Sequence, residues 1–205
     1  MGDPILDVGC GSGRLLARLA REGFADLTGI DPRLPEVEGR DARVRLLRVA
    51  LEDHAGRYRL VMAHHSFEHL ADPQRAFAAF ARLVEPGGHL LLRVPVADGW
   101  AARHYGPDWV QLDAPRHLHV PTRRSIERLA SDYGFRVVGA ADDSGPFQIH
   151  GSELYRRDTA LVEAGRAGPG LTARLAARWQ ARRLRRRGEG DQACFYLRRV
   201  DVPAT

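Results

Sequence analysis

Short apolar runs alternate with longer amphipathic runs along most of this chain. Helical periodicity fills residues 14–22, 73–84 and 122–133. Strand-like runs lie on either side of these segments, at 5–8, 27–30, 44–49, 60–63, 89–94, 135–140 and 193–197. Strands alternating with helices favour a parallel sheet covered on both faces, because a crossover must return the chain before each parallel strand. We therefore predict an α/β, Rossmann-like, doubly wound, mostly parallel seven-stranded sheet whose last strand is antiparallel.

Two segments depart from this alternation. Residues 32–42 are too rich in Pro and Gly for a convincing helix, so one face of the sheet is expected to be thinly covered. Residues 95–121 are irregular but carry several aromatic side chains, which argue against disorder. The second segment leaves the fifth strand at the edge where open α/β sheets bind ligands. We interpret it as a lid over an acceptor; the alternative is a rigid hydrophobic flap that touches no substrate.

The composition is that of a globular chain. It has 205 residues, of which 44% are hydrophobic and 28% charged, and this length predicts a single domain over residues 1–205. No apolar run approaches the ~20 residues that cross a bilayer, and no signal peptide precedes the first strand. The default expectation is a cytoplasmic location. Cys10 and Cys194 are expected to be reduced thiols that pack in the fold.

The positive charge is concentrated near the end of the chain. The net charge is +5, and every basic residue is Arg. Residues 171–187 predict an amphipathic helix, with Leu171, Leu175 and Trp179 at helical spacing among arginines. We favour a helix that covers the sheet with a solvated basic face; the alternative is peripheral contact with anionic lipid. Nucleic acid is disfavoured as a partner, since no binding module accompanies the arginines.

A glycine-rich turn follows the first predicted strand. Gly9, Gly11 and Gly13 form a G-x-G-x-G sequence, in which glycine permits tight turns and close approach of the backbone to a ligand. A dinucleotide-binding turn reads G-x-G-x-x-G, and Arg14 occupies the position of its last glycine. The turn predicts a nucleotide site and disfavours an NAD(P)-dependent oxidoreductase.

Two acids refine the choice of cofactor. Asp7 lies just before the turn, and Asp31 ends the second strand. A carboxylate beside a bound phosphate is unfavourable, whereas beside an ammonium it is favourable. S-adenosylmethionine carries an α-amino group and a sulfonium but no phosphate, so Asp7 fits it better than NAD, and Asp31 is placed for the ribose hydroxyls. We predict that S-adenosylmethionine is the cofactor, held by Asp7, Gly9, Gly11, Gly13 and Asp31.

Four further motifs carry a family resemblance. Residues 65–73 resemble H-x-x-E-H-L-x-D-P after a fourth strand, and residues 83–88 resemble L-x-x-P-G-G before a fifth. Residues 106–109 and 113–118 resemble G-x-x-W and D-x-P-R-H-L of one bacterial subgroup linked to small-molecule or surface-glycan pathways. In this order the motifs resemble the class I S-adenosylmethionine-dependent methyltransferases.

The resemblance implies in-line methyl transfer to a small-molecule, glycan or lipid-intermediate acceptor beneath the lid. It also adds Leu51, His64 and His65 to the cofactor site, although Ala50 stands where many relatives carry an acid. Relatives usually have some tens of residues before the first strand, so an N-terminal cap is expected to be missing here. A truncated methyltransferase that binds the cofactor but is catalytically weak is therefore an alternative.

An acceptor hydroxyl would need a general base. We favour His117, then His65, with Tyr105, His69 and His119 as further candidates, because an imidazole accepts a proton near neutrality. Each of these side chains could instead cap or pack a loop.

The lid also carries candidates for substrate binding. We include Trp109, Arg116 and His117, of which Arg116 could hold an anionic acceptor. The alternative for Arg116 is a salt bridge to Asp113.

The spacing of His65, Glu68 and His69 also matches a zinc-peptidase motif, H-x-x-E-H. That chemistry needs a sustained helix, whereas here the motif leaves a strand directly and Asp72-Pro73 follow at once. We therefore predict no metal site.

Overall fold

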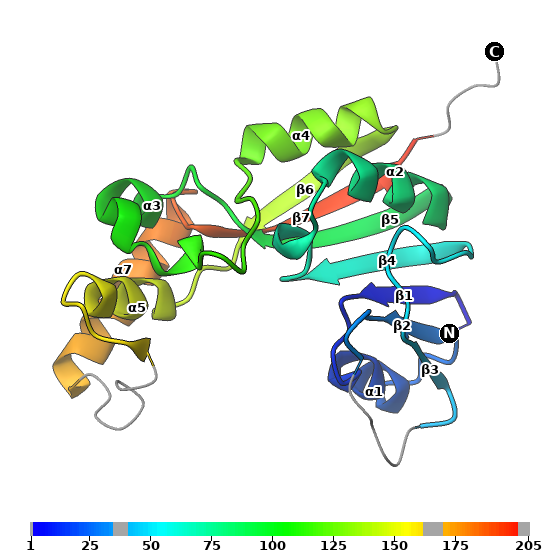
Figure 1. Ribbon diagram of the computed structural model, residues 1–205, viewed down its shortest axis with the longest axis horizontal. Helices are drawn as coiled ribbons and strands as arrows, with labels where there is room; N and C mark the ends of the chain where they lie inside the picture. Colours follow the sequence, from blue (N-terminus) through cyan, green and yellow to red (C-terminus); the bar gives the residue numbers. More distant parts are fainter. Residues whose placement is uncertain (1, 35–40, 162–169, 201–205) are drawn as a thin grey trace.

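The chain folds around a seven-stranded sheet, seen in a computed structural model that describes residues 2–34, 41–161 and 170–200. The strand order is β3-β2-β1-β4-β5-β7-β6 (Figure 1). Strands β1 to β5 are parallel, and β7 is antiparallel to both of its neighbours. The predicted fold class is confirmed. The strands are β1 (Ile5–Val8), β2 (Leu27–Ile30), β3 (Val44–Leu47), β4 (Tyr58–His64), β5 (Val84–Pro95), β6 (Phe135–Asp142) and β7 (Gln192–Arg199).

Helices cover both faces of the sheet. Helices α2 (Pro73–Leu83) and α4 (Arg123–Asp132) lie on one face, and α1 (Arg14–Arg21) lies on the other (Figure 1). The main core lies under α2 and α4, where the rings of Phe67, Phe77 and Phe80 are fully buried. The prediction for residues 32–42 falls partly outside the described residues, because 35–40 are not described.

Two helices begin with the caps that their sequences encode. The side chain of Asp72 accepts hydrogen bonds from the backbone N–H groups of Gln74 (2.9 Å) and Arg75 (3.1 Å), with Pro73 in the first turn. Thr122 forms a capping box with Ser125 at the start of α4.

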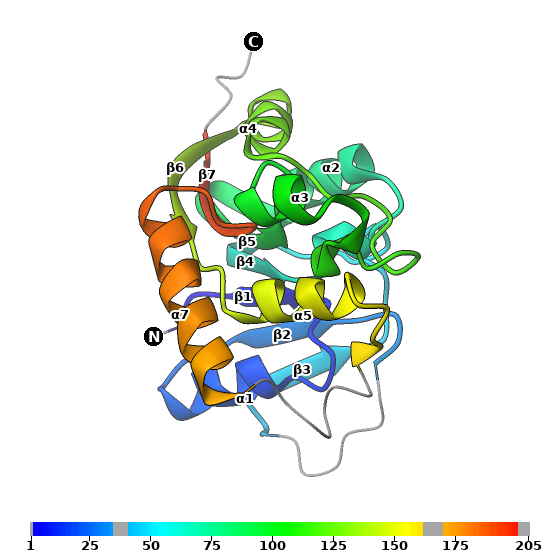
Figure 2. The same cartoon turned by 90° about the vertical axis from the view of Figure 1, so that its left-hand side faces the viewer.

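A lobe of short helices stands beyond the carboxyl ends of the parallel strands (Figures 1 and 2). The segment predicted to be irregular, 95–121, contains one short helix and two 3-10 turns. The lobe also contains α5, which the sequence did not predict, and α7, close to its predicted bounds. Its elements are α3 (Trp100–Tyr105), η2 (Gly106–Asp108), η3 (Val110–Leu112), α5 (Phe147–Tyr155) and α7 (Leu171–Arg186).

The lobe packs around small apolar groups of its own. Ala101, Tyr105 and Trp109 are buried together, and Ile149 of α5 contacts the buried alanines of α7. Within the described ranges, no helix combines the length and the apolar character that a membrane crossing requires.

The hydrogen bonds that Asp72 accepts at the start of α2 can be tested by substitution. Asp72→Ala should lower the free energy of unfolding by about 0.5–2 kcal/mol, because two backbone donors at the start of α2 lose their acceptor. Asp72→Asn keeps an acceptor oxygen and should retain most of the stability in urea denaturation. Equal losses in both variants would instead assign the effect to the carboxylate charge near Arg75.

Candidate functional site

A cleft opens where the carboxyl ends of β1, β2 and β4 meet. Its volume is about 310 Å³. Four of the residues predicted for the cofactor, Gly9, Asp31, Leu51 and His65, line it together. The complete lining is Val8, Gly9, Ile30, Asp31, Pro32, Arg33, Val49, Ala50, Leu51, Glu52, His65, Ser66, His69 and Leu70.

The glycine turn is built for close approach. Gly9 has φ +74°, and a Cβ there would lie only 2.5 Å from the Cβ of Ser66. Gly13 has φ +76°, and a Cβ there would lie 2.8 Å from Leu46 Cδ1. Both positions need glycine for its backbone conformation and for its lack of a side chain. The turn therefore leaves exposed backbone at the floor of the cleft.

Asp31 is held in place by the same turn. Its Oδ2 accepts a hydrogen bond from the N–H of Gly11 (3.0 Å), and its Oδ1 accepts one from the N–H of Arg33 (2.8 Å). A carboxylate has about four lone-pair positions, so both oxygens can still accept hydroxyl groups of a ligand. This arrangement suits a ribose diol.

Asp7 is placed differently from the prediction. It is 4% exposed within β1 and does not line the cleft. Burial, followed by the nearby carboxylate of Asp31, raises the pKa of Asp7 to about 7. Gly11, Gly13 and His64 also lie outside the lining, although Gly11 acts on it through Asp31. Burial, followed by the positive charge of Arg93, lowers the pKa of His64.

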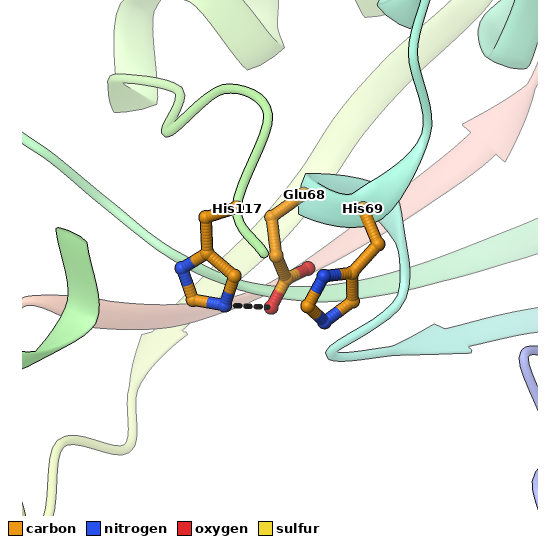
Figure 3. A group of neighbouring side chains, drawn as sticks. All are labelled: Glu68, His69 and His117. Atoms are coloured by element: carbon orange, nitrogen blue, oxygen red, sulfur yellow. Dashed lines mark ion pairs between the residues drawn. The ribbon is translucent and has the colours of Figure 1, made fainter. Parts of the chain in front are cut away.

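A second group of polar side chains adjoins the cleft. Glu68, in the 3-10 turn η1 (Phe67–His69), points between His69 and His117 (Figure 3). Glu68 is 0% exposed, and neither carboxylate oxygen accepts a hydrogen bond within the described part of the chain. Its Oε1 lies 3.3 Å from His65 Nδ1 and 3.9 Å from His117 Nε2. These imidazoles are the cationic partners that the structure offers the buried carboxylate, and both of its oxygens can still accept a proton or a further donor.

The two imidazoles beside Glu68 are oriented by backbone carbonyls. His69 Nδ1 lies 2.8 Å from the carbonyl oxygen of Arg116, and His117 Nδ1 lies 2.7 Å from that of Gln111. A carbonyl only accepts, so each Nδ1 carries a hydrogen, and in the neutral form of each imidazole the lone pair lies on Nε2. One ligand atom from each of Glu68, His69 and His117 lies within 4.8 Å of the others. These atoms can accept a proton or hold a divalent cation.

These three residues differ from the candidate metal ligands that the sequence motif suggested. The H-x-x-E-H spacing joins His65 to His69, whereas the structure joins Glu68 and His69 to His117 of the lid. Glu68 is the functional candidate that sequence reasoning left out of the site, whereas His69 was a further candidate for the base. The available signal was an acid next to Phe67 in a segment that otherwise enters the core.

Two lid residues predicted for the site lie elsewhere. Tyr105 is 4% exposed, and its hydroxyl donates to Glu153 Oε1 (3.0 Å). Burial, followed by that hydrogen bond, raises the pKa of Tyr105 far above its usual range, which opposes a role as base. Trp109 is 3% exposed, and its indole N–H donates to Asp191 (2.7 Å). Both side chains stabilise the lobe and do not line the cleft.

Two further lid residues have structural partners. Arg116 donates to Asp113 at 2.7 Å, which is the salt-bridge alternative to a substrate contact. His119 packs edge-on against Phe67, with ring centroids 4.9 Å apart, and burial lowers its pKa. Of the histidines in the lid, His117 is the one that reaches Glu68.

Comparisons with known proteins point to one family. Residues 2–140 match a family model described as a methyltransferase domain. The ubiquinone biosynthesis O-methyltransferase of Pectobacterium carotovorum subsp. carotovorum is 37% identical over 132 residues, which cover 58% of this chain and 54% of that protein. The protein of the same name from Klebsiella pneumoniae subsp. pneumoniae is 34% identical, with the same coverage. The chain thus spans about half the length of these curated relatives.

Solved structures share the fold at low sequence identity. Phosphoethanolamine N-methyltransferase 2 of Haemonchus contortus, in complex with S-adenosyl-L-methionine, has a TM-score of 0.63 and 18% identity, covering 98% of this chain and 49% of its own. The [4+2]-cyclase SpnF has a TM-score of 0.67 and 21% identity, with 98% and 76% coverage. A cyclase on this fold shows that architecture alone does not set the reaction.

The raised pKa of Asp7 predicts a pH effect on stability. A carboxyl group whose pKa is raised by folding binds its proton more tightly in the folded chain, so stability falls as pH rises from the unfolded pKa near 4 to about 7. Between pH 5 and 8, the free energy of unfolding should fall by about 2–3 kcal/mol more in the wild type than in Asp7→Asn. Urea denaturation without cofactor measures this difference.

The exposed Asp3→Asn should leave the wild-type pH slope unchanged. Asp191, whose pKa burial also raises, is present in all three proteins and cancels from the comparison. Parallel slopes for the wild type and Asp7→Asn would contradict the assignment.

Proposed function

Because the chain belongs to the methyltransferase domain family, we propose that it transfers the methyl group of S-adenosylmethionine to a hydroxyl of a small-molecule acceptor. One observation carries the proposal: the cofactor cleft and the Glu68 group share His69, which lines the first and belongs to the second. Donor and acceptor sites therefore meet at one short turn.

The residues of the cleft fit the cofactor. Residue 9 must be glycine because a Cβ there would collide with Ser66, and glycine leaves the backbone uncovered for a ligand. Asp31 retains lone pairs that can accept the hydroxyl groups of a ribose. Leu51 is buried in the wall and offers an apolar surface to an adenine, with Ala50 in place of an acid. When bound, S-adenosylmethionine supplies a methyl group on a sulfonium, an electrophile that needs no further activation.

The Glu68 group supplies the acceptor side. With its Nδ1 hydrogen on the Gln111 carbonyl, the neutral form of His117 has its lone pair on Nε2, which can take the proton of an acceptor hydroxyl while Glu68 stabilises the imidazolium. General base catalysis of this kind contributes ~10²–10⁴-fold. His65, at the edge of the cleft, is the second candidate for this role.

The acceptor class rests on the curated relatives. They are named for O-methylation in ubiquinone biosynthesis, which favours a hydroxyl on a small molecule. A glycan or lipid-intermediate acceptor remains the more specific sequence-based alternative. Both use the same cleft and the same base.

A cation is the second candidate for the Glu68 group. Glu68, His69 and His117 offer one carboxylate and two imidazoles whose Nδ1 hydrogens are already committed to carbonyls. Metal-binding histidines usually show this second hydrogen bond, and the ion would neutralise a buried carboxylate that accepts no hydrogen bond in the described part of the chain. The sequence predicts no metal site, and measuring activity after chelation distinguishes that prediction from a bound cation.

Cofactor binding tests the first part of the proposal. By calorimetry, S-adenosylmethionine and S-adenosylhomocysteine should bind and NADH should not, and Asp31→Ala should weaken both at least tenfold because the ribose loses its acceptor. Asp26→Ala, an exposed acid before β2, is the matched control. Tighter binding of NADH would overturn the cofactor assignment.

The base is tested separately with a panel of phenolic acceptors. His117→Ala should lower turnover by ~10²–10⁴ while cofactor affinity is retained, because the side chain lies outside the cleft lining. The exposed His104→Ala is the control. Loss of activity on chelation, with recovery on adding Zn²⁺ or Mg²⁺, would instead favour the cation.

A further inference from the structure

Helix α7 presents its largest apolar side chains to solvent. Leu171, Leu175 and Trp179 are 72%, 56% and 65% exposed. The side of α7 that packs on α5 carries the smaller Ala177 and Ala181, followed by Leu184. At 3.6 residues per turn, Leu175 and Trp179 lie roughly 160–200° around the helix from Ala177. A helix that only covered the fold would place these residues the other way round.

Positive charge surrounds the exposed stripe. The helix contains six arginines and no acidic residue; the arginines are Arg174, Arg178, Arg182, Arg183, Arg185 and Arg186. A shallow cleft of about 260 Å³ lies beside the indole, lined by Trp179, Arg182, Arg183, Arg186 and Arg187. The Arg183 guanidinium lies 5.6 Å from the centre of the Trp179 ring. Guanidinium groups around a small concave surface suit a phosphate.

We propose that α7 is a docking surface for a membrane containing anionic phospholipid. The cleft would seat a lipid phosphate, while Leu171, Leu175 and Trp179 enter the interface beside it. An interface needs both features on one side of a helix, whereas a nucleic acid would use the arginines but leave the leucines exposed. The charge of the helix is complementary to anionic headgroups.

The position of α7 is consistent with this role. It lies at the edge of the lobe and crosses α5, which it contacts (Figure 2), and α5 carries another exposed ring, that of Phe147 (56%). Contact through α7 would bring the lobe to the lipid surface while the sheet remains in water. The inference does not depend on the identity of the acceptor.

The test uses the full chain and sedimentation with vesicles. The chain should bind vesicles of equal parts phosphatidylcholine and phosphatidylglycerol, bind phosphatidylcholine alone at least tenfold more weakly, and lose affinity as salt rises. Tryptophan emission should shift to shorter wavelength on binding. Trp179→Phe should abolish that shift, because Trp100 and Trp109 pack in the lobe, while leaving most of the binding, because phenylalanine keeps an apolar ring at this position.

Two multiple variants separate charge from insertion. Arg182→Gln/Arg183→Gln/Arg186→Gln and Leu175→Ser/Trp179→Ser should each weaken binding at least tenfold with an unchanged melting temperature, because all five side chains are exposed. The matched control, Arg18→Gln/Arg21→Gln/Arg128→Gln, removes the same charge from exposed sites on α1 and α4 and should bind normally.

Three outcomes would overturn the proposal. The first is that the chain does not bind the mixed vesicles. The second is that the control variant loses as much binding as the arginine variant, which would indicate that net charge alone is responsible. The third is full binding by the Leu175→Ser/Trp179→Ser variant, which would exclude insertion. A chain that ignores vesicles but binds RNA through the same arginines would assign α7 to nucleic acid.

Discussion

The contact between Gly9 and Ser66 is the constraint on which the rest of the site depends. The hydroxyl of Ser66 donates to the carbonyl of Val8 (2.8 Å) and joins the turn after β1 to the turn after β4. The contact exists only because residue 9 has no side chain. Gly9 and Ser66 both line the cofactor cleft. Ser66 also directly precedes the short η1 turn in which Glu68 is buried.

The fold could be predicted where sequence signals were local. The strands β1 and β2 have the predicted bounds because a glycine turn ends one and an acid ends the other. The early start of β5 was missed because its Pro86-Gly87-Gly88 sequence is typical of a turn, although Val84 pairs with Tyr58. Helix α5 was missed because it has no apolar stripe. It packs through Gly151, where a Cβ would lie 2.6 Å from Val110.

The site residues likewise divide into those that local sequence signals predicted and those that depend on contacts between distant segments. Gly9, Asp31 and Leu51 line the cleft, because Gly9 and Asp31 directly follow β1 and β2 and Leu51 lies in the loop after β3. The meeting of Glu68 with His117 depends on how the lid folds back, which no local pattern encodes. Trp109 was expected to contact substrate because it is aromatic and lies in the lid, but the lobe needs a core of its own.

The strand order has a consequence for how the protein is made. Among the described residues, strand β6 pairs with β7 and with no other strand, although β7 begins 50 residues after β6 ends. During synthesis β6 therefore has no partner until residues 192–199 leave the ribosome. The same late segment brings Asp191 to the indole of Trp109. Completion of the sheet and fixation of the lid thus both wait for residues 191–199.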